Sequence, residues 1–530
     1  MGLRGRLIDF LGSDRTAPTD RNTFRLLSLI KKPPRADKWV LLSKKLTYST
    51  GGAMAVIGKN AGGLEAAAAT FTVEALAKDL QPEVEAALIK HGKAAQRQSK
   101  VSALLGVWFI LALGLRRELS YQHLLDWLLS GLRGLGWNIP RHSLAEGTLT
   151  HVRKRIGVEV IRELFEASKR IVGCLAPDFH GFVSLAIDGT GLTMPDTPQN
   201  LQRFGKPGTK RGTPAFPQMR LVGLVATATQ AIYDAAFAPC RGKGTGEIAL
   251  GKILVLKNAA AGILFLLDRG FCGIDLLHTI LTRGGAFLIR VPNNRLVLRR
   301  IRGSTLADGS YLASLVGKIV DPSGPRPDGR KRWLRVEHEV RVIDYQIRGF
   351  RKTQLITSLL DPGVPARELV RHYHRRWEIE LVYDEIKTHQ CATRTGQSRT
   401  ILRSKLPLLV EQELYAMLTL YNLLRDLINQ AAERHDLDPL RISFVGALRA
   451  TLDAIPAMQR APLERLRILY EQLLDDIARC VMKRWRRKRA YPRVVKVKMS
   501  SYGLKRSEHK QTFRDFDAQT KVFGEVRQPA

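Results

Sequence analysis

The order of predicted strands and helices between residues 182 and 292 constrains the fold of this 530-residue chain more than any other feature. Three segments rich in β-branched and apolar residues come first, bounded by Gly, Pro and Asn: FVSLAIDGT, QMRLVGLVATAT and AIYDAAFAP. A predicted helix (246–260), a strand (263–271), a second helix (273–284) and a last strand (286–292) follow. This alternation predicts an α/β domain.

Three strands, a helix, a strand, a helix and a strand is the order of a ribonuclease H-like core, although several topologies share it. The block that follows alternates apolar and polar residues, which predicts a basic β-rich insertion before the core resumes. Helical patterns flank the core on both sides. The predicted segments are a poorly defined N-terminus (1–75), a helical DNA-binding domain (76–180), the first part of the core (181–292), the insertion (293–352), the second part of the core (353–400), a C-terminal helical region (401–482) and a basic tail (483–530).

The charge balance points to a polyanionic partner. Lys and Arg number 85 against 49 Asp and Glu, which gives a formal net charge of +36. So basic a surface repels itself unless a polyanion is nearby, which makes nucleic acid the first partner to test. An anionic membrane surface or a ribosome would satisfy the charge equally. The tail carries 12 Lys and Arg and one Glu between residues 483 and 510, a pattern typical of phosphate-binding or disordered segments.

Two predicted helices before the core form a candidate DNA-reading pair. The segment ELSYQHLLDWLLSGL has apolar residues at helical spacing, with Ser120 as a plausible N-cap. The second helix, predicted over 146–171, carries Arg153, Lys154 and Arg155. Two helices joined by a turn can place such a basic cluster against DNA. The alternative is a solvated basic face on a small helical bundle.

Several other patterns argue against particular functions. The apolar run Val101–Leu115 is shorter than the roughly 20 residues of a membrane-spanning helix, so we expect a buried helix and no membrane partner. The five cysteines are scattered, and no secretion signal is visible, which favours a reducing cytoplasm. The segment Gly242–Glu247 is rich in glycine but lacks the Lys-Ser/Thr of a P-loop, so ATP use is not expected. It is better interpreted as a turn and a helix start, with Glu247 near the acidic residues of the core.

Two of those acidic residues end predicted strands. Asp188 follows the apolar run FVSLAI, and Asp268 follows ILFLL. A carboxylate at the end of a buried strand must be paired, hydrogen-bonded or bound to a metal, because an isolated buried charge is costly. Phosphodiester chemistry on DNA commonly uses two divalent ions about 3.5–4 Å apart, held by such hard oxygen ligands. Each Asp taken singly is equally consistent with a turn former or a helix cap.

A third acidic residue lies on a long predicted helix, residues 365–390. Tyr373, Arg376, Glu380 and Lys387 stand there at offsets 0, 3, 7 and 14. At about 100° per residue these four side chains fall within an arc of about 60°. A carboxylate between two cations on one stripe can join a metal site while its neighbours bind phosphates. By charge alone, a solvated helix face explains the stripe as well.

The four residues Tyr373, Arg376, Glu380 and Lys387 match the Tyr-x2-Arg-x3-Glu-x6-Lys signature of the insertion-sequence-four group of DDE transposases. The rest of the chain resembles that group from about residue 95 to 505. IDGT and DRGF correspond to its first two acidic motifs, and the spacing of 112 residues from Asp268 to Glu380 leaves room for the group's β insertion. The segment GTLTHVRKRIG resembles its N-terminal domain.

The resemblance implies a transposase that cuts and joins DNA in the bacterial cytoplasm, associated with the nucleoid. It implies that Asp188, Asp268 and Glu380 bind two Mg²⁺ ions, for which Mn²⁺ can substitute. Tyr373, Arg376 and Lys387 would contact phosphates at the transposon end. The implied partners are transposon-end and target DNA and a second copy of the chain, with a homodimer on paired ends.

Trp333, in the basic run GRKRWLR, is the candidate for stacking on a flipped base if the reaction passes through a hairpin intermediate. It is equally consistent with a strand residue that packs within the insertion. Two other functions stay open at this stage. One is a ribonuclease H-like endonuclease that cuts DNA structures without joining them, and the other is a transposase-derived DNA-binding protein without activity.

Overall fold

A computed structural model of the chain describes residues 81–94, 102–134, 146–172, 176–208, 214–292, 295–324, 326–391, 400–461, 463–482, 516 and 519–524. The predicted N-terminal segment 1–75 and the basic run 483–510 lie outside the described residues. No helix among the described residues has both the length and the apolar character needed to cross a membrane.

The core has the predicted order of strands and helices and the predicted ribonuclease H-like topology. β1 pairs with β2 and β2 with β3 in antiparallel fashion, whereas β1 pairs with β4 and β4 with β5 in parallel. A short helix, α8 (Pro198–Phe204), lies between β1 and β2 and was not predicted. The core elements are β1 (Val183–Thr193), β2 (Gln218–Ala226), β3 (Ile232–Pro239), α9 (Glu247–Asn258), β4 (Ile263–Leu267), α10 (Ile274–Thr282) and β5 (Ala286–Val291).

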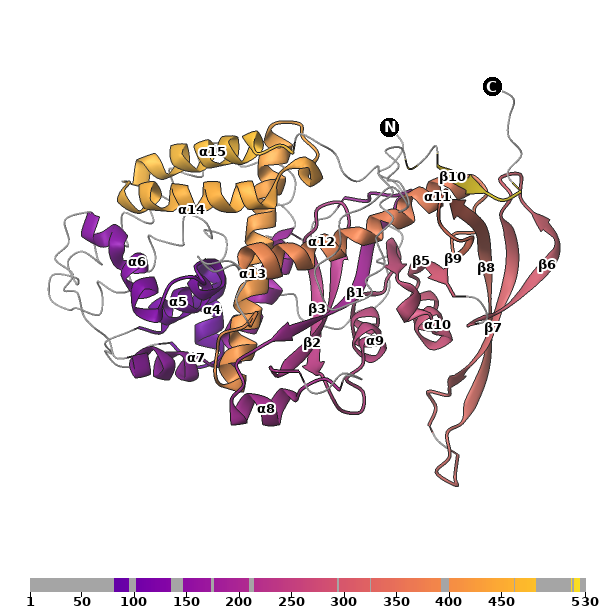
Figure 1. The fold of residues 1–530 in the computed structure, drawn as a ribbon, viewed down its shortest axis with the longest axis horizontal. Coiled ribbons are helices and arrows are strands. Elements are labelled where there is room, and N and C mark those ends of the chain that lie inside the picture. Colours follow the sequence, from indigo (N-terminus) through magenta and orange to yellow (C-terminus); the bar gives the residue numbers. More distant parts are fainter. Residues whose placement is uncertain are drawn as a thin grey trace, which may run out of the picture. The chain divides into compact units, whose positions relative to one another are not determined.

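The insertion is β-rich, as predicted, but it continues the core sheet (Figure 1). Its strands are β6 (Val297–Thr305), β7 (Tyr311–Val320) and β8 (Trp333–Ile347). The next strand, β9 (Thr353–Thr357), pairs with both β5 and β8, so the sheet order runs β3-β2-β1-β4-β5-β9-β8-β7-β6. A last strand, β10 (Thr520–Val522), pairs with β8. The sequence did not predict this return of the C-terminal segment to the core.

Alternation along the strands assigns each face of the sheet to different helices. Leu185 and Ile187 of β1 pack with residues of α9 and α10, whereas Ala186 belongs to the apolar cluster on the opposite face. That opposite face is covered by α11 (Ala366–Tyr373) and α12 (Glu378–Asp384). Side chains of β1 at even positions from 184 to 190 therefore face the helix that carries the Tyr-Arg-Glu-Lys residues.

That helix is not the single regular α-helix that we predicted. A 3₁₀ turn, η2 (His374–Trp377), joins α11 to α12, and a π-helical segment, η3 (Glu385–Gln390), follows α12. A regular 3.6-residue period therefore does not hold from Tyr373 to Lys387, and the single-stripe geometry is wrong in detail. Along this irregular helix, Tyr373 contacts the end of β4, whereas Arg376 and Lys387 contact residues of β1.

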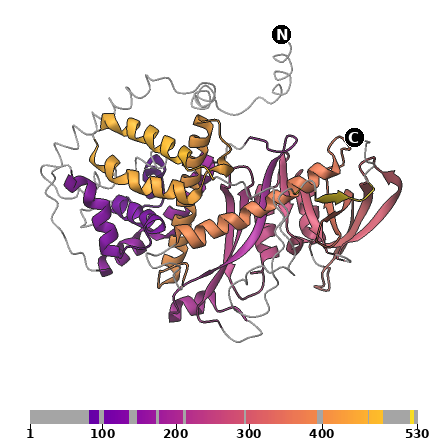
Figure 2. The ribbon, with the colours of Figure 1, turned by 45° about the horizontal axis from the view of Figure 1, so that its top comes forward.

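Helices before and after the core pack together beside the sheet and remote from β6–β8 (Figures 1 and 2). The prediction of a buried helix at Val101–Leu115 is confirmed by α5, whose residues are buried almost throughout. Ser120 accepts a hydrogen bond from the backbone of His123, as expected of an N-cap. These helices are α4 (Gln81–Lys90), α5 (Ala103–Leu115), α6 (Tyr121–Gly134), α7 (Glu146–Val172), α13 (Pro407–Arg434), α14 (Phe444–Arg460) and α15 (Leu463–Arg479).

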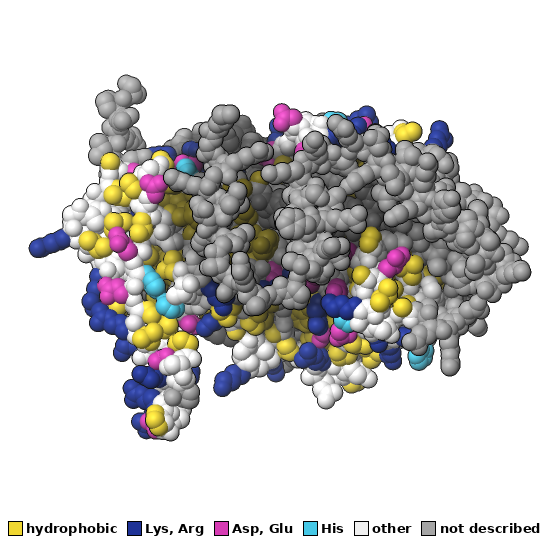
Figure 3. Space-filling view, turned by 180° about the vertical axis from the view of Figure 1, so that it is seen from behind, with side chains coloured by type: hydrophobic (Ala, Val, Ile, Leu, Met, Phe, Trp, Pro, Cys, Tyr) yellow, Lys and Arg dark blue, Asp and Glu magenta, His cyan; other side chains and the backbone are white. Residues whose placement is uncertain are grey.

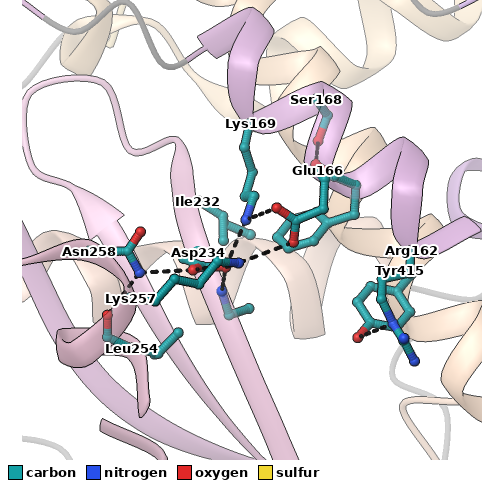
Figure 4. Close-up of polar contacts among 12 residues, drawn as sticks. Arg162, Glu166, Ser168, Lys169, Ile232, Asp234, Leu254, Lys257, Asn258 and Tyr415 are labelled. Atoms are coloured by element: carbon teal, nitrogen blue, oxygen red, sulfur yellow. Dashed lines mark hydrogen bonds and ion pairs between the residues drawn. The ribbon is translucent and has the colours of Figure 1, made fainter. Parts of the chain in front are cut away.

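A buried carboxylate joins α7 to the core (Figure 4). Asp234 of β3 accepts hydrogen bonds from Lys169 of α7 at 2.9 Å and from Asn258 of α9 at 2.8 Å. Nζ of Lys257, also in α9, lies 3.1 Å from Oδ2 of Asp234. A buried carboxylate that is satisfied by partners from separate elements fixes those elements relative to one another.

Candidate active site

Asp188 ends the buried part of β1 on the face toward α12. Its side chain is 24% exposed, and one oxygen accepts the backbone N–H of Gly189 at 2.7 Å. The other oxygen lies 3.4 Å from Nη1 of Arg376. The strand thus carries the carboxylate from the apolar interior to the edge of solvent.

Asp268 occupies the matching place on the neighbouring strand. In the parallel register of β1 and β4, Ile187 pairs with Leu267; Asp188 is the next residue of β1, and Asp268 directly follows β4. Adjacent strands lie about 4.8 Å apart, so both carboxylates leave the sheet at the same edge. The apolar residues before each Asp are buried, which fixes this register.

Glu380 reaches the same place from α12. Arg376 Nη2 donates to Glu380 Oε1 at 2.9 Å, and the same guanidinium contacts Asp188. Arg376 is 5% exposed and therefore brings two carboxylates together in a largely buried position. Asp268 lies close enough to both Asp188 and Arg376 to influence their ionisation. The structure thus brings Asp188 and Glu380 together on Arg376, with Asp268 nearby at the end of the adjoining strand.

The electrostatics of this cluster are those of crowded negative charge. Burial raises the pKa of Asp188 to about 6, and the neighbouring carboxylates of Asp268 and Glu380 add to the rise. The Gly189 N–H and the Arg376 guanidinium act in the opposite direction and do not cancel it. The ionised form of Asp188 is therefore under-stabilised by this chain alone.

The chemistry of these side chains suits a divalent cation, since carboxylate oxygens are the ligands that Mg²⁺ prefers and a cation would relieve the crowding at Asp188. In this arrangement, however, Asp188, Asp268 and Glu380 are not grouped closely enough to hold a metal ion, and neither are any other three His, Cys, Asp or Glu side chains in the described part of the chain. The guanidinium of Arg376 bridges Asp188 and Glu380 in this arrangement.

Lys387 lies beyond the acid cluster, along β1. Its Nζ donates to Oγ1 of Thr190, which faces the helix two residues after Asp188. Burial lowers the pKa of Lys387. The π-helical turn that contains Lys387 is held against α13, because Gln390 donates to the Met417 carbonyl at 2.9 Å.

Tyr373 does not face solvent. It is 4% exposed, and its hydroxyl donates to the Leu267 carbonyl at 3.1 Å, directly before Asp268. In this arrangement the predicted phosphate contact is not available to Tyr373. The hydroxyl instead ties the start of the signature helix to the end of β4.

The predicted basic cluster on α7 is divided by burial. Lys154 and Arg155 are exposed, whereas Arg153 is fully buried. Arg153 donates to Gln412 at 3.0 Å, to Tyr121 at 2.6 Å and to Ser404 at 3.1 Å. The prediction that Arg153 contacts DNA is therefore wrong, because its donors are used inside the protein.

Trp333 opens β8 and is 55% exposed, so it does not pack inside the insertion. Its strand partner Val320 is also exposed, and Leu334 beside it is 46% exposed. An exposed aromatic ring on a projecting hairpin leaves the stacking role open to Trp333.

Sequence reasoning missed Tyr383 and placed Glu247 only loosely. The Tyr383 hydroxyl donates to the Asp188 carbonyl at 2.7 Å. Glu247 begins α9, as the helix-start interpretation of its glycine-rich segment predicted, and its side chain packs over Gly189. The glycines at 189 and 223 were the only sequence signal for these close approaches, since each lacks the Cβ that would collide.

The chain matches two families of known proteins. A family described as "Transposase DDE domain" matches residues 181–423, which include all three acidic residues. A second family, "Insertion element 4 transposase N-terminal", matches residues 70–166. Among solved structures, the piggyBac transposase synaptic complex with hairpin DNA is similar at a TM-score of 0.39 and 11% identity, covering 77% of this chain and 84% of that one.

Two Escherichia coli K12 proteins are similar in sequence. The putative transposase InsZ is 30% identical over 145 residues, which cover 27% of this chain and 47% of that protein. The transposase InsG of insertion sequence element IS4 is 30% identical over 438 residues, which cover 80% of this chain and 92% of InsG. Identity of this extent, together with both family matches, shows that the chain belongs to the IS4 family of DDE transposases.

Proposed function

We propose that this transposase cleaves DNA at the ends of its element and joins the freed ends to target DNA at the cluster of Asp188, Asp268 and Glu380. The observation that carries the proposal is that Asp188 and Glu380 contact one guanidinium, while Asp268 lies at the end of the strand next to Asp188 and near enough to affect the pKa of Asp188. Two Mg²⁺ ions, or Mn²⁺ in their place, would activate the attacking oxygen and stabilise the leaving oxygen.

Arg376 has two alternative partners in this proposal. Without a metal its guanidinium compensates the charge of Asp188 and Glu380. Once cations take over that compensation, Arg376 is released to donate to a phosphate of the transposon end, for which its planar fork is suited. Lys387 contacts Thr190, which lies two residues after Asp188 on β1, and would hold the next phosphate.

The insertion offers the second DNA contact. Lys and Arg side chains gather along the projecting β7–β8 hairpin and the neighbouring edge (Figure 3). Phosphate contacts of this kind orient DNA without reading its sequence. Trp333 stands among them and would stack on an unpaired base. The exposed basic residues of this surface are Arg295, Arg299, Arg300, Arg302, Lys318, Arg330, Lys331, Arg332 and Arg335.

We further propose that Lys154 and Arg155 of α7 add a smaller DNA contact, and that two copies of the chain act on paired ends. We also propose that the DNA on which it acts is that of the bacterial nucleoid.

The test is cleavage and strand transfer with DNA that carries the inverted repeats flanking the gene. We expect both reactions with Mg²⁺ or Mn²⁺, and their loss in Asp188→Asn, Asp268→Asn and Glu380→Gln with DNA binding retained. The exposed Asp436→Asn serves as a matched control that should keep full activity.

Other results would favour the other functions. Cutting of branched DNA without joining would indicate a structure-specific endonuclease. Tight binding of the repeats without cleavage under any divalent ion would indicate a DNA-binding protein that has lost its activity.

A further inference from the structure

Tyr383 inserts its hydroxyl between two strands directly at the first acidic residue. Asp188 of β1 and Gly223 of β2 are opposed in the antiparallel register. The Tyr383 hydroxyl accepts the Gly223 N–H at 2.8 Å and donates to the Asp188 carbonyl at 2.7 Å. A side chain of α12 thus links the backbone donor and acceptor of an opposed pair.

The space for this hydroxyl exists because residue 223 is a glycine. A Cβ at Gly223 would lie 2.8 Å from the Tyr383 oxygen, closer than real contacts allow. The flanking residues of β2 on the same face, Leu221 and Val225, are large and buried. Gly223 therefore leaves a gap in an otherwise filled face, and the phenol occupies it.

Tyr383 also lies one helical turn after Glu380. The residue is 8% exposed, and burial raises the pKa of its hydroxyl, so the group stays protonated and keeps its donor. The same short helix therefore carries one acidic residue and grips the backbone of another.

We propose that Tyr383 is a positioning residue that fixes Asp188 relative to Glu380, so that the two carboxylates meet at the separation needed to share a cation. The inference rests on the proposed function of the three acidic residues. Tyr383 itself touches neither DNA nor metal in this account. It acts through the β1 backbone, as groups behind metal ligands commonly do.

The experiment measures Mn²⁺ binding to the full chain by calorimetry and by the electron paramagnetic resonance of the free ion. Tyr383→Phe removes only the hydroxyl. We expect Mn²⁺ affinity to fall by about 10-fold or more, the usual effect of losing a group that orients a metal ligand. Asp188→Asn defines the signal that belongs to the acid cluster.

Tyr421→Phe is the matched control. Tyr421 is likewise buried, and its hydroxyl also donates once, to Glu385 at 2.7 Å, and accepts once, from Arg425 at 2.9 Å. We expect this variant to lose a similar amount of thermal stability and to keep wild-type Mn²⁺ affinity. A loss of affinity in both variants alike would mean that Tyr383 has only a structural role, and would overturn the proposal.

Gly223→Ala disturbs the same contact from the opposite strand and covers the case in which Tyr383→Phe folds poorly. We expect it to weaken Mn²⁺ binding on its own. The added methyl should do less harm in the Tyr383→Phe background, because the nearest ring atom, Cζ, would be at 3.6 Å. The two substitutions should therefore be non-additive, as expected of residues in contact.

The outcomes separate the two proposals. Wild-type affinity in Tyr383→Phe, with binding lost in Asp188→Asn, would refute the positioning role and leave the acid site standing. Mn²⁺ binding that Asp188→Asn does not change would refute the acid site itself.

Discussion

The acid cluster on β1 and α12 and the joint between α7 and α13 each bury an arginine, but the two arginines have opposite surroundings. Arg376 contacts two carboxylates that remain partly open to solvent. Arg153 is fully buried and donates to neutral acceptors, including Gln412 and the Leu409 carbonyl. One arginine compensates charge at an open edge, and the other is saturated inside the protein.

This difference separates a site from a scaffold. A buried donor set that is fully satisfied has nothing left for a ligand, and its loss is felt in stability. In a cluster with excess negative charge, the protein does not fully compensate the charge, and a divalent cation can supply the missing positive charge. Basic residues in the sequence therefore do not reveal their role until their partners are known.

The largest effect should come from the acid cluster. Glu380→Gln keeps the shape of the side chain and removes its charge, so we expect cleavage to fall on the order of 10³-fold or more, because metal assistance supplies several kcal/mol. Thermal unfolding should change little. If a folded Glu380→Gln variant still cleaves at near wild-type rate, the acid cluster is not the catalytic site, and the difference drawn between it and the Arg153 joint is wrong.

Arg153→Met should show the reverse pattern. It leaves buried acceptors without donors, so we expect a loss on the order of 3 kcal/mol of unfolding free energy, since each such group costs about 1–3 kcal/mol. Cleavage per folded molecule should be nearly unchanged. Lys154→Met is the matched control on the exposed neighbour and should alter stability by less than about 0.5 kcal/mol.

A smaller effect is expected on the basic edge. Arg299→Gln combined with Arg302→Gln removes two exposed charges of β6, and the salt dependence of DNA binding should weaken by a slope of about 2. Lys154→Gln on α7 should change the slope by about 1 at most. Equal slopes in the double variant and the wild type would exclude β6 from the DNA interface.

The smallest effect concerns pH. The folded pKa of Asp188 is about 6 against an ordinary value of 3.8, so the folded chain keeps a proton that the unfolded chain has released. Stability from this group is complete below pH 3.8 and is lost as pH rises through 6. In the absence of divalent ions, Asp188→Asn should therefore raise the melting temperature at pH 7.5, and the gain should vanish near pH 3.8.

Much of the fold could be predicted because it follows from local patterns. Apolar runs that end in Asp identified β1 and β4, and parallel pairing then brings Asp188 and Asp268 to one edge. The spacing of Arg376 and Glu380 predicted that both project from one side of the helix, and in the structure the two side chains are hydrogen-bonded.

The rest depends on partners far away in the sequence. Arg153 is buried because Gln412 and Ser404, more than 250 residues away, accept its hydrogen bonds, and no local pattern announces this. The 3₁₀ and π segments of the signature helix, which lie against β1 and α13, are not announced by any local pattern in the sequence. Likewise, the gap at Gly223 has meaning only once Tyr383 fills it.

The central claim is that Asp188, Asp268 and Glu380 share divalent cations. Anomalous diffraction from crystals of the chain with its element's end DNA and Mn²⁺ tests this most directly. We predict strong manganese peaks within about 2.0–2.3 Å of oxygens from all three side chains, with Arg376 moved from Asp188 to a phosphate. Manganese bound elsewhere, or an empty cluster with Arg376 still bridging Asp188 and Glu380 in the presence of DNA, would contradict the account.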